Sequence, residues 1–387
     1  MSNDNTEKSL RGKSGQENLG EIVDSLKRKN YITNYEEDYR KGYTMHDEKQ
    51  FHYQYMVEFA DKECWILQST TSVRSDRMNI HQWNSEHLKI INTNIKKSYI
   101  ITPNALSERE QKNVNAYKKK IRQKQMYSSI DDILNQSELY TKVEKHALEL
   151  ADNKGRFYAK AGNNFEEWLV EILNNKENYI KWKNDDTLLT GYMFNYFVTI
   201  VNKIGLMKQT VIGMNATTNI PRLESHGMPK TDLLLTVSTF EGLKNFTFSC
   251  KRCTLDRVAV HEYSAKQFVE VLDIKEKDLI DAIYNFQSAG NKKNMKPEFV
   301  DVMNEKMKLY NNCLAKWVFS GTGNEIQRAK FLITYKSEEE EFALYEVGEY
   351  IAKLENNNVN GTFGTLFSWT YPSHGKGHRI QLKSRII

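Results

Sequence analysis

The chain has 387 residues, 39% of them hydrophobic and 27% charged, with only 5 prolines and 19 glycines. This composition is typical of a globular protein with room for two domains, and it excludes a collagen-like or largely disordered chain. The net charge of +5 permits nucleic-acid binding without requiring it. The N-terminal residues are polar, and no apolar run approaches the roughly 20 residues of a membrane helix. We therefore expect a cytoplasmic protein without a membrane partner.

The first part of the chain, residues 1–105, is predicted to form a small α/β domain. Apolar residues recur at helical spacing between residues 16 and 28, which predicts an amphipathic helix. The stretches 51–59 and 64–70 flank a charged turn and are rich in aromatic or apolar residues, which predicts two strands. A short apolar run at 97–101 predicts one more strand.

The next segment, residues 106–152, is expected to be a helical connector. Its first part contains the run KKKIRQKQ and is strongly basic. Ser129 precedes Asp131 and Asp132, a pattern typical of a helix start because acidic side chains favour the first turn. The plainer interpretation is a solvated connector, and the alternative is that its basic part contacts phosphate groups.

The largest segment, residues 153–387, alternates between helical and strand patterns. Such alternation predicts an α/β fold with helices packed on a sheet. We expect helices at 163–174, 265–287 and 297–318, and strands at 232–240, 246–251, 330–335 and 342–347.

Two of these strands carry a chemically suggestive group of side chains. Ser249 and Lys251 lie two residues apart on a strand, so they point to the same face. A turn near Gly242 would fold Asp232 back beside them. A carboxylate can hold Mg²⁺ against a phosphate, and a lysine can orient the attacking water. Such triples also arise by chance, and alone they favour an exposed hairpin lysine and a turn-capping aspartate.

The C-terminal segment strengthens the functional interpretation. Residues 361–387 combine glycines, hydroxyls, basic residues and a Gln–Lys pair. Side chains of these types can reach base edges in the DNA major groove. Trp369 and Tyr371 indicate that the segment folds, whereas a solvated tail would lack them.

Together, these motifs resemble the MspI-type restriction endonucleases of the PD-(D/E)xK superfamily. The resemblance rests on PKTD, on the strand ending in SCK, on VxxxEY (258–263) and on the terminal FGTxxxWTYxSxxK followed by QxK, in that order between about 155 and 384. It implies a mixed central sheet flanked by helices, with the N-terminal α/β domain and helical connector as additions. It also implies Mg²⁺-dependent cleavage of double-stranded DNA at CCGG, leaving 5′-phosphates. The resemblance further implies that the protein is bacterial and acts alongside a cognate DNA methyltransferase. We expect it to be a monomer or a homodimer.

The resemblance assigns roles to individual residues. Asp232 matches the metal-binding aspartate and Lys251 the catalytic lysine. Ser249 stands where the family has asparagine, and we expect it to act in catalysis and at the metal. Glu166 resembles a glutamate on an early helix of the family and is a further catalytic candidate. The residues expected to contact DNA are Thr370, Ser373, Gln381, Lys383, Lys376, Arg252 and Arg257.

Three departures qualify this assignment. Lys230 and Thr231 separate the proline of the motif from Asp232, and Ser249 replaces the second acid. Ala259 stands where the family has a base-contacting serine, which leaves room for an altered site. A nicking endonuclease, a subunit of a heteromeric restriction enzyme and a non-catalytic DNA-binding protein therefore remain as alternatives.

The resemblance does not cover the N-terminal domain, although this domain repeats the order helix, strand, turn, strand. Where a nuclease would carry ExK, it has Gln68, Ser69 and Thr70 and no lysine. We expect an inactive nuclease-like domain that is either an accessory DNA-binding element or a stabilising appendage. Its candidate DNA contacts are Arg74, Arg77 and Gln82.

Overall fold

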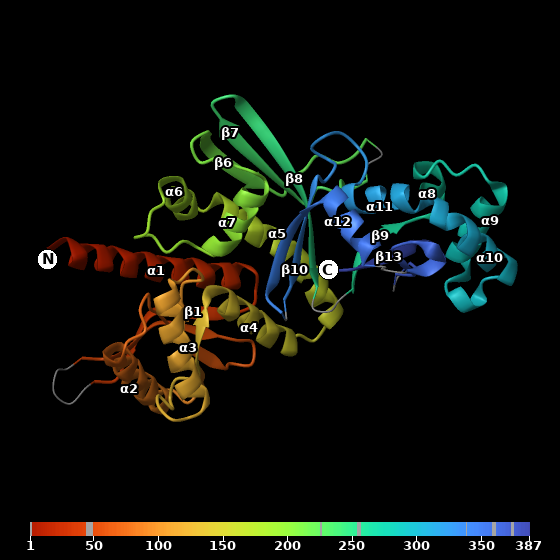
Figure 1. Cartoon of the computed structure of the whole chain (residues 1–387). Coiled ribbons are helices and arrows are strands. Elements are labelled where there is room, and N and C mark those ends of the chain that lie inside the picture. Colours follow the sequence, from red (N-terminus) through yellow and green to blue (C-terminus); the bar gives the residue numbers. More distant parts are fainter. Residues whose placement is uncertain are drawn as a thin grey trace. The chain divides into compact units, whose positions relative to one another are not determined.

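The computed structural model describes residues 2–43, 49–224, 227–253, 257–337, 339–357, 361–372 and 375–387. The chain folds as two compact units (Figure 1). Unit 1 comprises residues 1–202 and 207–209, and unit 2 comprises 203–206 and 210–387. The division lies later than the boundary near residue 152 expected from the sequence. One reason is that α5 (Lys154–Asn174) packs on the N-terminal elements, where its Glu171 pairs with Lys29 over 2.7 Å.

Unit 1 is a five-stranded sheet with helices on both faces. Its order is β1-β2-β3-β4-β5, with β1, β2 and β3 antiparallel and β3, β4 and β5 parallel. Its elements are α1 (Ser2–Arg28), β1 (Asn34–Lys41), β2 (Phe51–Glu58), β3 (Cys64–Ser69), α2 (Ser75–Ile91), β4 (Ile95–Thr102), α3 (Glu108–Arg122), β5 (Asp132–Asn135), α4 (Gln136–Glu149), α5, α6 (Lys176–Asn184) and α7 (Phe194–Lys203).

The helices of unit 1 pack against its sheet through apolar side chains. Met78 and Leu88 of α2 and Val114 and Ile121 of α3 share one apolar cluster with buried residues of the sheet. Helices α1 and α4 contact the sheet and each other. The expectation that 106–152 is entirely helical is wrong at 132–135, because this stretch forms β5 and pairs with β4 in parallel. Strand β1, which lacks an alternating apolar pattern, was not predicted at all.

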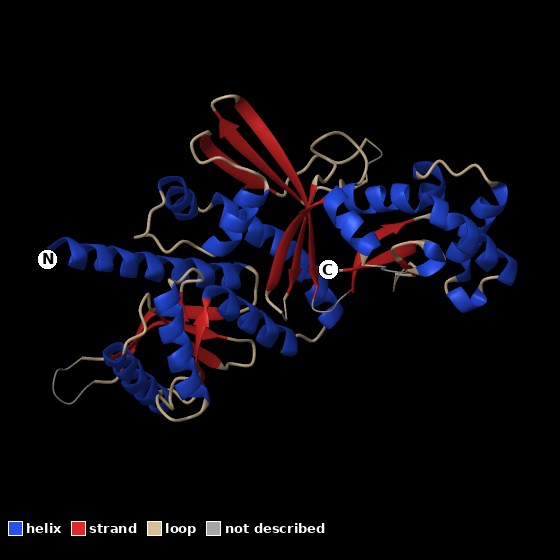
Figure 2. Cartoon of the chain, in the orientation of Figure 1, coloured by secondary structure: helices blue, strands red, loops and turns tan. Residues whose placement is uncertain are grey.

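Unit 2 contains a second five-stranded sheet and a smaller three-stranded one (Figure 2). Its elements are β6 (Val211–Thr217), β7 (Leu233–Thr239), β8 (Gly242–Cys253), β9 (Arg257–Tyr263), α8 (Ala265–Val271), α9 (Lys277–Ala289), η1 (Lys292–Asn294), α10 (Pro297–Lys306), η2 (Met307–Tyr310), α11 (Asn311–Ser320), β10 (Phe331–Lys336), β11 (Glu341–Glu346), α12 (Val347–Asn356), η3 (Thr362–Gly364), β12 (Ser368–Thr370) and β13 (Ile380–Arg385).

The larger sheet of unit 2 is mixed, as expected from the sequence. Its order is β11-β10-β8-β7-β6, with β10 parallel to β8 and all other neighbours antiparallel. The smaller sheet has the order β12-β13-β9, with all pairs antiparallel. Residues of β9 and β13 share an apolar core with α8, α9, α10, α11 and α12. The small sheet is therefore anchored by the helices that lie between β9 and β12 in the chain.

The two long helices expected in unit 2 are each interrupted. The helix expected at 265–287 breaks after α8, where Asp273 adopts a left-handed φ of 51°. Leu272 and Ile274 are buried on either side of this break, so burial of both side chains favours the interruption. The helix expected at 297–318 breaks at η2, where Met307 is fully buried. In the described part of the chain, no helix has the length and apolar character needed to cross a membrane.

Candidate active site

The candidate site is built on the hairpin of β7 and β8. The strands pair from Leu233 opposite Phe248 to Thr239 opposite Gly242. Gly242 has a φ of 126°, a conformation that L side chains rarely adopt, which accounts for glycine at the turn. The backbone N–H of Asp232 donates to the carbonyl of Phe248 over 2.8 Å, so the ladder extends one residue beyond β7 and places Asp232 beside β8.

Three groups donate hydrogen bonds to one carboxylate oxygen, Oδ2 of Asp232. They are the hydroxyl of Ser249 at 3.0 Å, the backbone N–H of Cys250 at 2.7 Å and Nζ of Lys251 at 3.1 Å. Nζ of Lys251 also donates to the carbonyl of Cys250 over 2.8 Å. The structure thus brings together the aspartate, serine and lysine that the sequence singled out.

The depth of these side chains decides how each can act. Ser249 is fully buried within the sheet, opposite Leu332 of the parallel strand β10. The side chains of Asp232 and Lys251 retain 22% and 15% exposure. A carboxylate and an ammonium that are partly open to solvent can meet a substrate, whereas the serine can reach it only through its neighbours.

Another lysine next to this cluster was not predicted as a site residue. Nζ of Lys230 donates to the carbonyl of Val260 on β9 over 2.6 Å. Burial lowers the pKa of Lys230 to about 7, and the nearby charge of Lys251 adds to this effect. Its place in the PKTD motif was the available signal, but only the tertiary structure shows that it is partly buried and bonded to β9.

His261, next to Val260, is buried among Tyr263, Phe268 and Trp317. Its Nε2 has no hydrogen-bond partner among the described residues. Burial, with a smaller effect from Lys230, holds its pKa well below the ordinary value. The aromatic surroundings favour a neutral core histidine.

The small sheet displays the residues expected to read DNA bases. On β13, Gln381 and Lys383 are half-buried and alternate with the buried Leu382, so they point to the same face. Thr370 pairs with Gln381, and its hydroxyl lies 3.1 Å from the Gln381 carbonyl and 3.3 Å from its side-chain oxygen. Lys383 pairs with Ala259 on β9. One open face of this sheet therefore carries all three candidates.

The other expected DNA contacts of unit 2 are spread around the two sheets. Lys376 is exposed in the segment before β13. The Arg252 guanidinium lies over the ring of Tyr335 at 5.5 Å. Arg257 donates to the hydroxyl of Ser368 over 3.2 Å and so links β9 to β12. Ser373 lies outside the described residues.

The remaining candidates lie in unit 1. Glu166 lies on α5 of unit 1, whereas Asp232, Ser249 and Lys251 belong to unit 2. Arg74 is paired with Asp76 over 2.7 Å, and Arg77 lies 3.5 Å from the hydroxyl of Thr70. Gln82 exchanges hydrogen bonds with Ser129 through both ends of its amide. The amide of Gln82 is thus committed to holding the fold.

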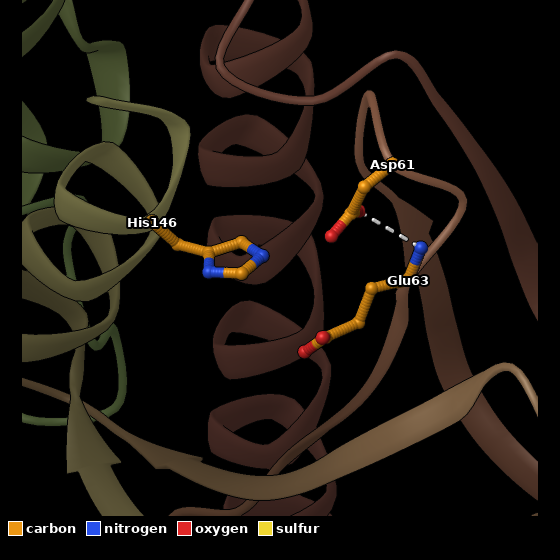
Figure 3. A group of neighbouring side chains, drawn as sticks. All are labelled: Asp61, Glu63 and His146. Carbon is orange, nitrogen blue, oxygen red and sulfur yellow. Dashed lines mark hydrogen bonds between the residues drawn. The ribbon is translucent and has the colours of Figure 1, made fainter. Parts of the chain in front are cut away.

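Unit 1 also contains a group of potential metal ligands, Asp61, Glu63 and His146 (Figure 3). Their ligand atoms lie within 4.8 Å of one another, and the His146 ring points toward the two carboxylates. Asp61 accepts from the backbone N–H of Glu63 over 3.0 Å, and Glu63 accepts from the indole of Trp65 over 2.7 Å. These hydrogen bonds give both acids a structural role in the β2–β3 turn.

A mixed sheet whose hairpin brings an aspartate and a lysine together is typical of the PD-(D/E)xK class of nucleases. Residues 139–384 match the family described as "Restriction endonuclease MspI". The type II restriction enzyme BsuFI of Bacillus subtilis is 31% identical over 99% of both chains. The chain therefore belongs to the MspI restriction endonuclease family and is a type II site-specific deoxyribonuclease.

A solved structure supports the fold. The crystal structure of restriction endonuclease MspI in complex with its cognate DNA matches with a TM-score of 0.52 at 18% identity. The match covers 64% of this chain and 99% of that chain. The PD-(D/E)xK-like architecture expected from the sequence is thus confirmed.

Proposed function

We propose that the enzyme cleaves double-stranded DNA within a short palindrome, CCGG, by Mg²⁺-dependent hydrolysis that leaves 5′-phosphates. The observation that carries this proposal is the convergence of Ser249 and Lys251 on the carboxylate of Asp232. The DNA bound in the MspI crystal structure supports a duplex substrate.

The donor atoms of the cluster suit a hard divalent cation. The described hydrogen bonds of the Asp232 carboxylate all go to Oδ2, which leaves Oδ1 for a cation. The hydroxyl oxygen of Ser249 is the second candidate ligand. Mg²⁺ prefers oxygen ligands and keeps several waters, so two protein ligands are sufficient. When bound, such an ion neutralises the charge that builds on the phosphate in the transition state.

The protein groups around Asp232 have distinct tasks in this proposal. Ser249 and the backbone N–H of Cys250 hold the carboxylate in one orientation. The ammonium of Lys251 orients the attacking water and stabilises the negative charge of the reacting phosphate. A preorganised cluster of this kind avoids reorganisation during the reaction, which is where much of the rate enhancement arises.

Base recognition is assigned to the open face of the small sheet. Gln381 and Lys383 can donate to base edges in the major groove, and Thr370 adds a hydroxyl. The exposed Lys376 and the arginines Arg252 and Arg257 are suited to phosphate contacts, which position the protein without reading sequence. Ala259 lacks the hydroxyl of the family's serine, so recognition of CCGG would depend on the other base contacts.

Digestion of unmethylated plasmid with purified protein and Mg²⁺, followed by sequencing of the fragment ends, tests this function. Discrete fragments that end within CCGG support both the activity and the site. Fragments that end within another palindrome contradict CCGG and direct attention to Ala259. Nicked circles alone favour a nicking enzyme or a subunit of a heteromeric enzyme. Intact plasmid with retained DNA binding favours a non-catalytic binding protein.

An active enzyme of this kind needs a cognate DNA methyltransferase in its bacterial host, because unmodified sites in the genome would be cut. It would act in the cytoplasm, where the genome lies.

Cleavage of both strands of a palindrome requires a homodimer or two successive events by a monomer. Sedimentation of the protein with and without a duplex carrying the site distinguishes these two assemblies.

Unit 1 has a basic surface that suits an accessory role in DNA binding. A shallow hollow along α3 is lined by Asn115, Lys118, Lys119, Arg122 and Gln123. Lys118 and Arg122 are paired with Glu138 and Asp132. Among the described residues, neither Lys119 nor the neighbouring exposed Lys120 has an acidic partner, which leaves two cations for phosphate groups.

The salt dependence of binding tests this accessory role. Neutralising Lys119 and Lys120 together, each to Gln, should reduce the slope of log affinity against log salt by about 0.9 for each phosphate group that the protein no longer neutralises. The control is Lys62→Gln, which removes an exposed lysine of the β2–β3 turn. An unchanged slope in the double variant would favour a stabilising appendage instead.

A further inference from the structure

A partly buried lysine joins the segment that carries Asp232 to the sheet expected to read DNA bases. Nζ of Lys230 donates to the carbonyl of Val260 over 2.6 Å. Lys230 lies two residues before Asp232, and Val260 lies on β9 of the small sheet. The hydrogen bond therefore connects the segment that leads into β7 with the small sheet of unit 2.

Val260 is the irregular position of β9. Leu382 of β13 pairs with His261, and the next residue, Lys383, pairs with Ala259. Val260 thus has no partner residue on β13, which makes it the extra residue of a β-bulge. Bulges leave their extra residue outside the regular ladder and are common beside active sites. Here the carbonyl of the bulged residue receives the ammonium of Lys230.

The bulge lies directly beside the candidate base-reading residues. Lys383 pairs with the residue before Val260, and Gln381 pairs with Glu262 two residues after it. A shift of β13 on binding a base pair would therefore act on β9 at this point. The carbonyl of Val260 is the group that would transmit such a shift to Lys230.

Lys230 is itself held firmly. Its backbone N–H and that of Thr231 both donate to the carbonyl of Gln327, over 3.1 and 3.2 Å. A Cβ atom placed at Gly321 would lie 2.4 Å from Cβ of Lys230, so the lysine stem packs tightly against that glycine. The position of Lys230 is consequently set by its surroundings. Its ammonium and its backbone thus contact two different neighbours, Val260 and Gln327, within two residues of Asp232.

We propose that Lys230 is a positioning residue that couples recognition of the DNA site by β9 and β13 to the placement of Asp232. This inference rests on the proposed function. A displacement of about 1 Å at a reacting group can cost roughly 100-fold in rate, so a single hydrogen bond at this place is sufficient to separate productive from unproductive complexes. In this arrangement, a correct site aligns the carboxylate, and a wrong site leaves it misaligned.

The test compares Lys230→Met, which keeps the stem without the donor, with Lys230→Arg, which keeps a donor. Single-turnover cleavage in Mg²⁺ and binding in Ca²⁺ are measured on a cognate duplex and on one with a single altered base pair. For Lys230→Met, we expect cognate cleavage to slow by about 10- to 100-fold, in line with the cost of misplacement. We also expect binding within about threefold of the wild type and a smaller ratio of cognate to altered-site cleavage. Lys230→Arg should recover part of both the rate and the ratio.

Lys244→Met is the matched control, because it removes an exposed lysine of the same hairpin that is paired with Glu241 over 2.8 Å. Thermal unfolding establishes that each variant is folded. If the methionine variant does not fold, Lys230→Gln, which is too short to reach Val260, takes its place. Wild-type cleavage by a folded variant, or a parallel loss of binding and cleavage without any change in discrimination, would overturn the proposal. Failure of the wild type to cut any DNA would instead overturn the proposed function and this inference together.

Discussion

The hydroxyl of Ser249 donates a hydrogen bond of 3.0 Å to the carboxylate of Asp232 from a fully buried position in the sheet. A neutral residue thus occupies the place where many nucleases of this class have a second acid. It orients the remaining carboxylate and adds no negative charge. The Mg²⁺ dependence that we propose for the enzyme should reflect this arrangement.

Replacement of Ser249 by Ala should raise the Mg²⁺ concentration needed for half-maximal cleavage by about 5- to 10-fold. Loss of one hydrogen bond costs roughly 1 to 1.4 kcal/mol, which corresponds to that range. Ser249→Asn, which restores a polar oxygen at this position, should stay closer to the wild type. Ser238→Ala, near the turn of the same hairpin, is the control. A Mg²⁺ requirement that is identical in Ser249→Ala and the wild type would show that the hydroxyl does not support the metal site.

Replacement of Lys251 by Met should reduce single-turnover cleavage by about 10²- to 10⁴-fold, the range expected when a group that assists proton transfer is removed. Asp232→Asn should reduce cleavage at least as strongly, because its carboxylate is the principal candidate metal ligand. Binding to the cognate duplex in Ca²⁺ should remain nearly intact for Lys251→Met, as measured by fluorescence anisotropy. Normal cleavage by either variant would mean that the active site lies elsewhere.

The two residues at the open face of β13 should affect sequence discrimination more than overall affinity. Gln381→Ala or Lys383→Ala should each cost about 1–3 kcal/mol of discrimination between the cognate site and a site with one altered base pair. Lys376→Ala should weaken binding to all duplexes equally and lower the salt slope by about 0.9. Lys266→Ala, an exposed lysine of α8, is the control. Unchanged discrimination in both β13 variants would remove this strand from base reading.

His81 of α2 should make the stability of unit 1 depend on pH. Burial lowers its pKa to about 4, and the nearby Arg77 and His52 add to this effect. In the unfolded chain the pKa is about 6.5, so the unfolded state binds more protons between pH 6.5 and 4. Stability is therefore lost as the pH falls through this window, by at most roughly 3 kcal/mol and by less where solvent reaches the ring.

Urea unfolding at pH 7 and pH 4.5 checks this dependence. The loss of stability between the two values should be smaller for His81→Gln than for the wild type, because the substitution removes the group whose protonation favours unfolding. His378→Gln, an exposed position in unit 2, should behave like the wild type. An equal loss of stability in wild type and His81→Gln would assign the pH dependence to other groups.

The sequence alone predicted the local features of the candidate site on the hairpin of β7 and β8. Alternation of side chains along the strand predicted that Ser249 and Lys251 share one face. A glycine at the turn predicted a hairpin that brings Asp232 beside them. Strand side chains alternate with a period of two whatever the tertiary context, so this inference needed no knowledge of distant contacts. The order of motifs from PKTD to QxK likewise predicted the family and the mixed sheet.

Only the tertiary structure could show which residues the rest of the chain surrounds. Lys230 appears in the sequence as an ordinary basic residue of the PKTD motif, but hydrogen bonds with Val260 and Gln327 hold it in place and tie it to β9. The bulge at Val260 arises from the pairing of β9 with a strand more than 100 residues away, which no local pattern encodes. Strand β5 lies in a segment that the sequence predicted to be helical. It forms because the edge of β4 is available for pairing. Local periodicity determines which face of an element is apolar, whereas long-range pairing and burial decide which polar groups become part of a site.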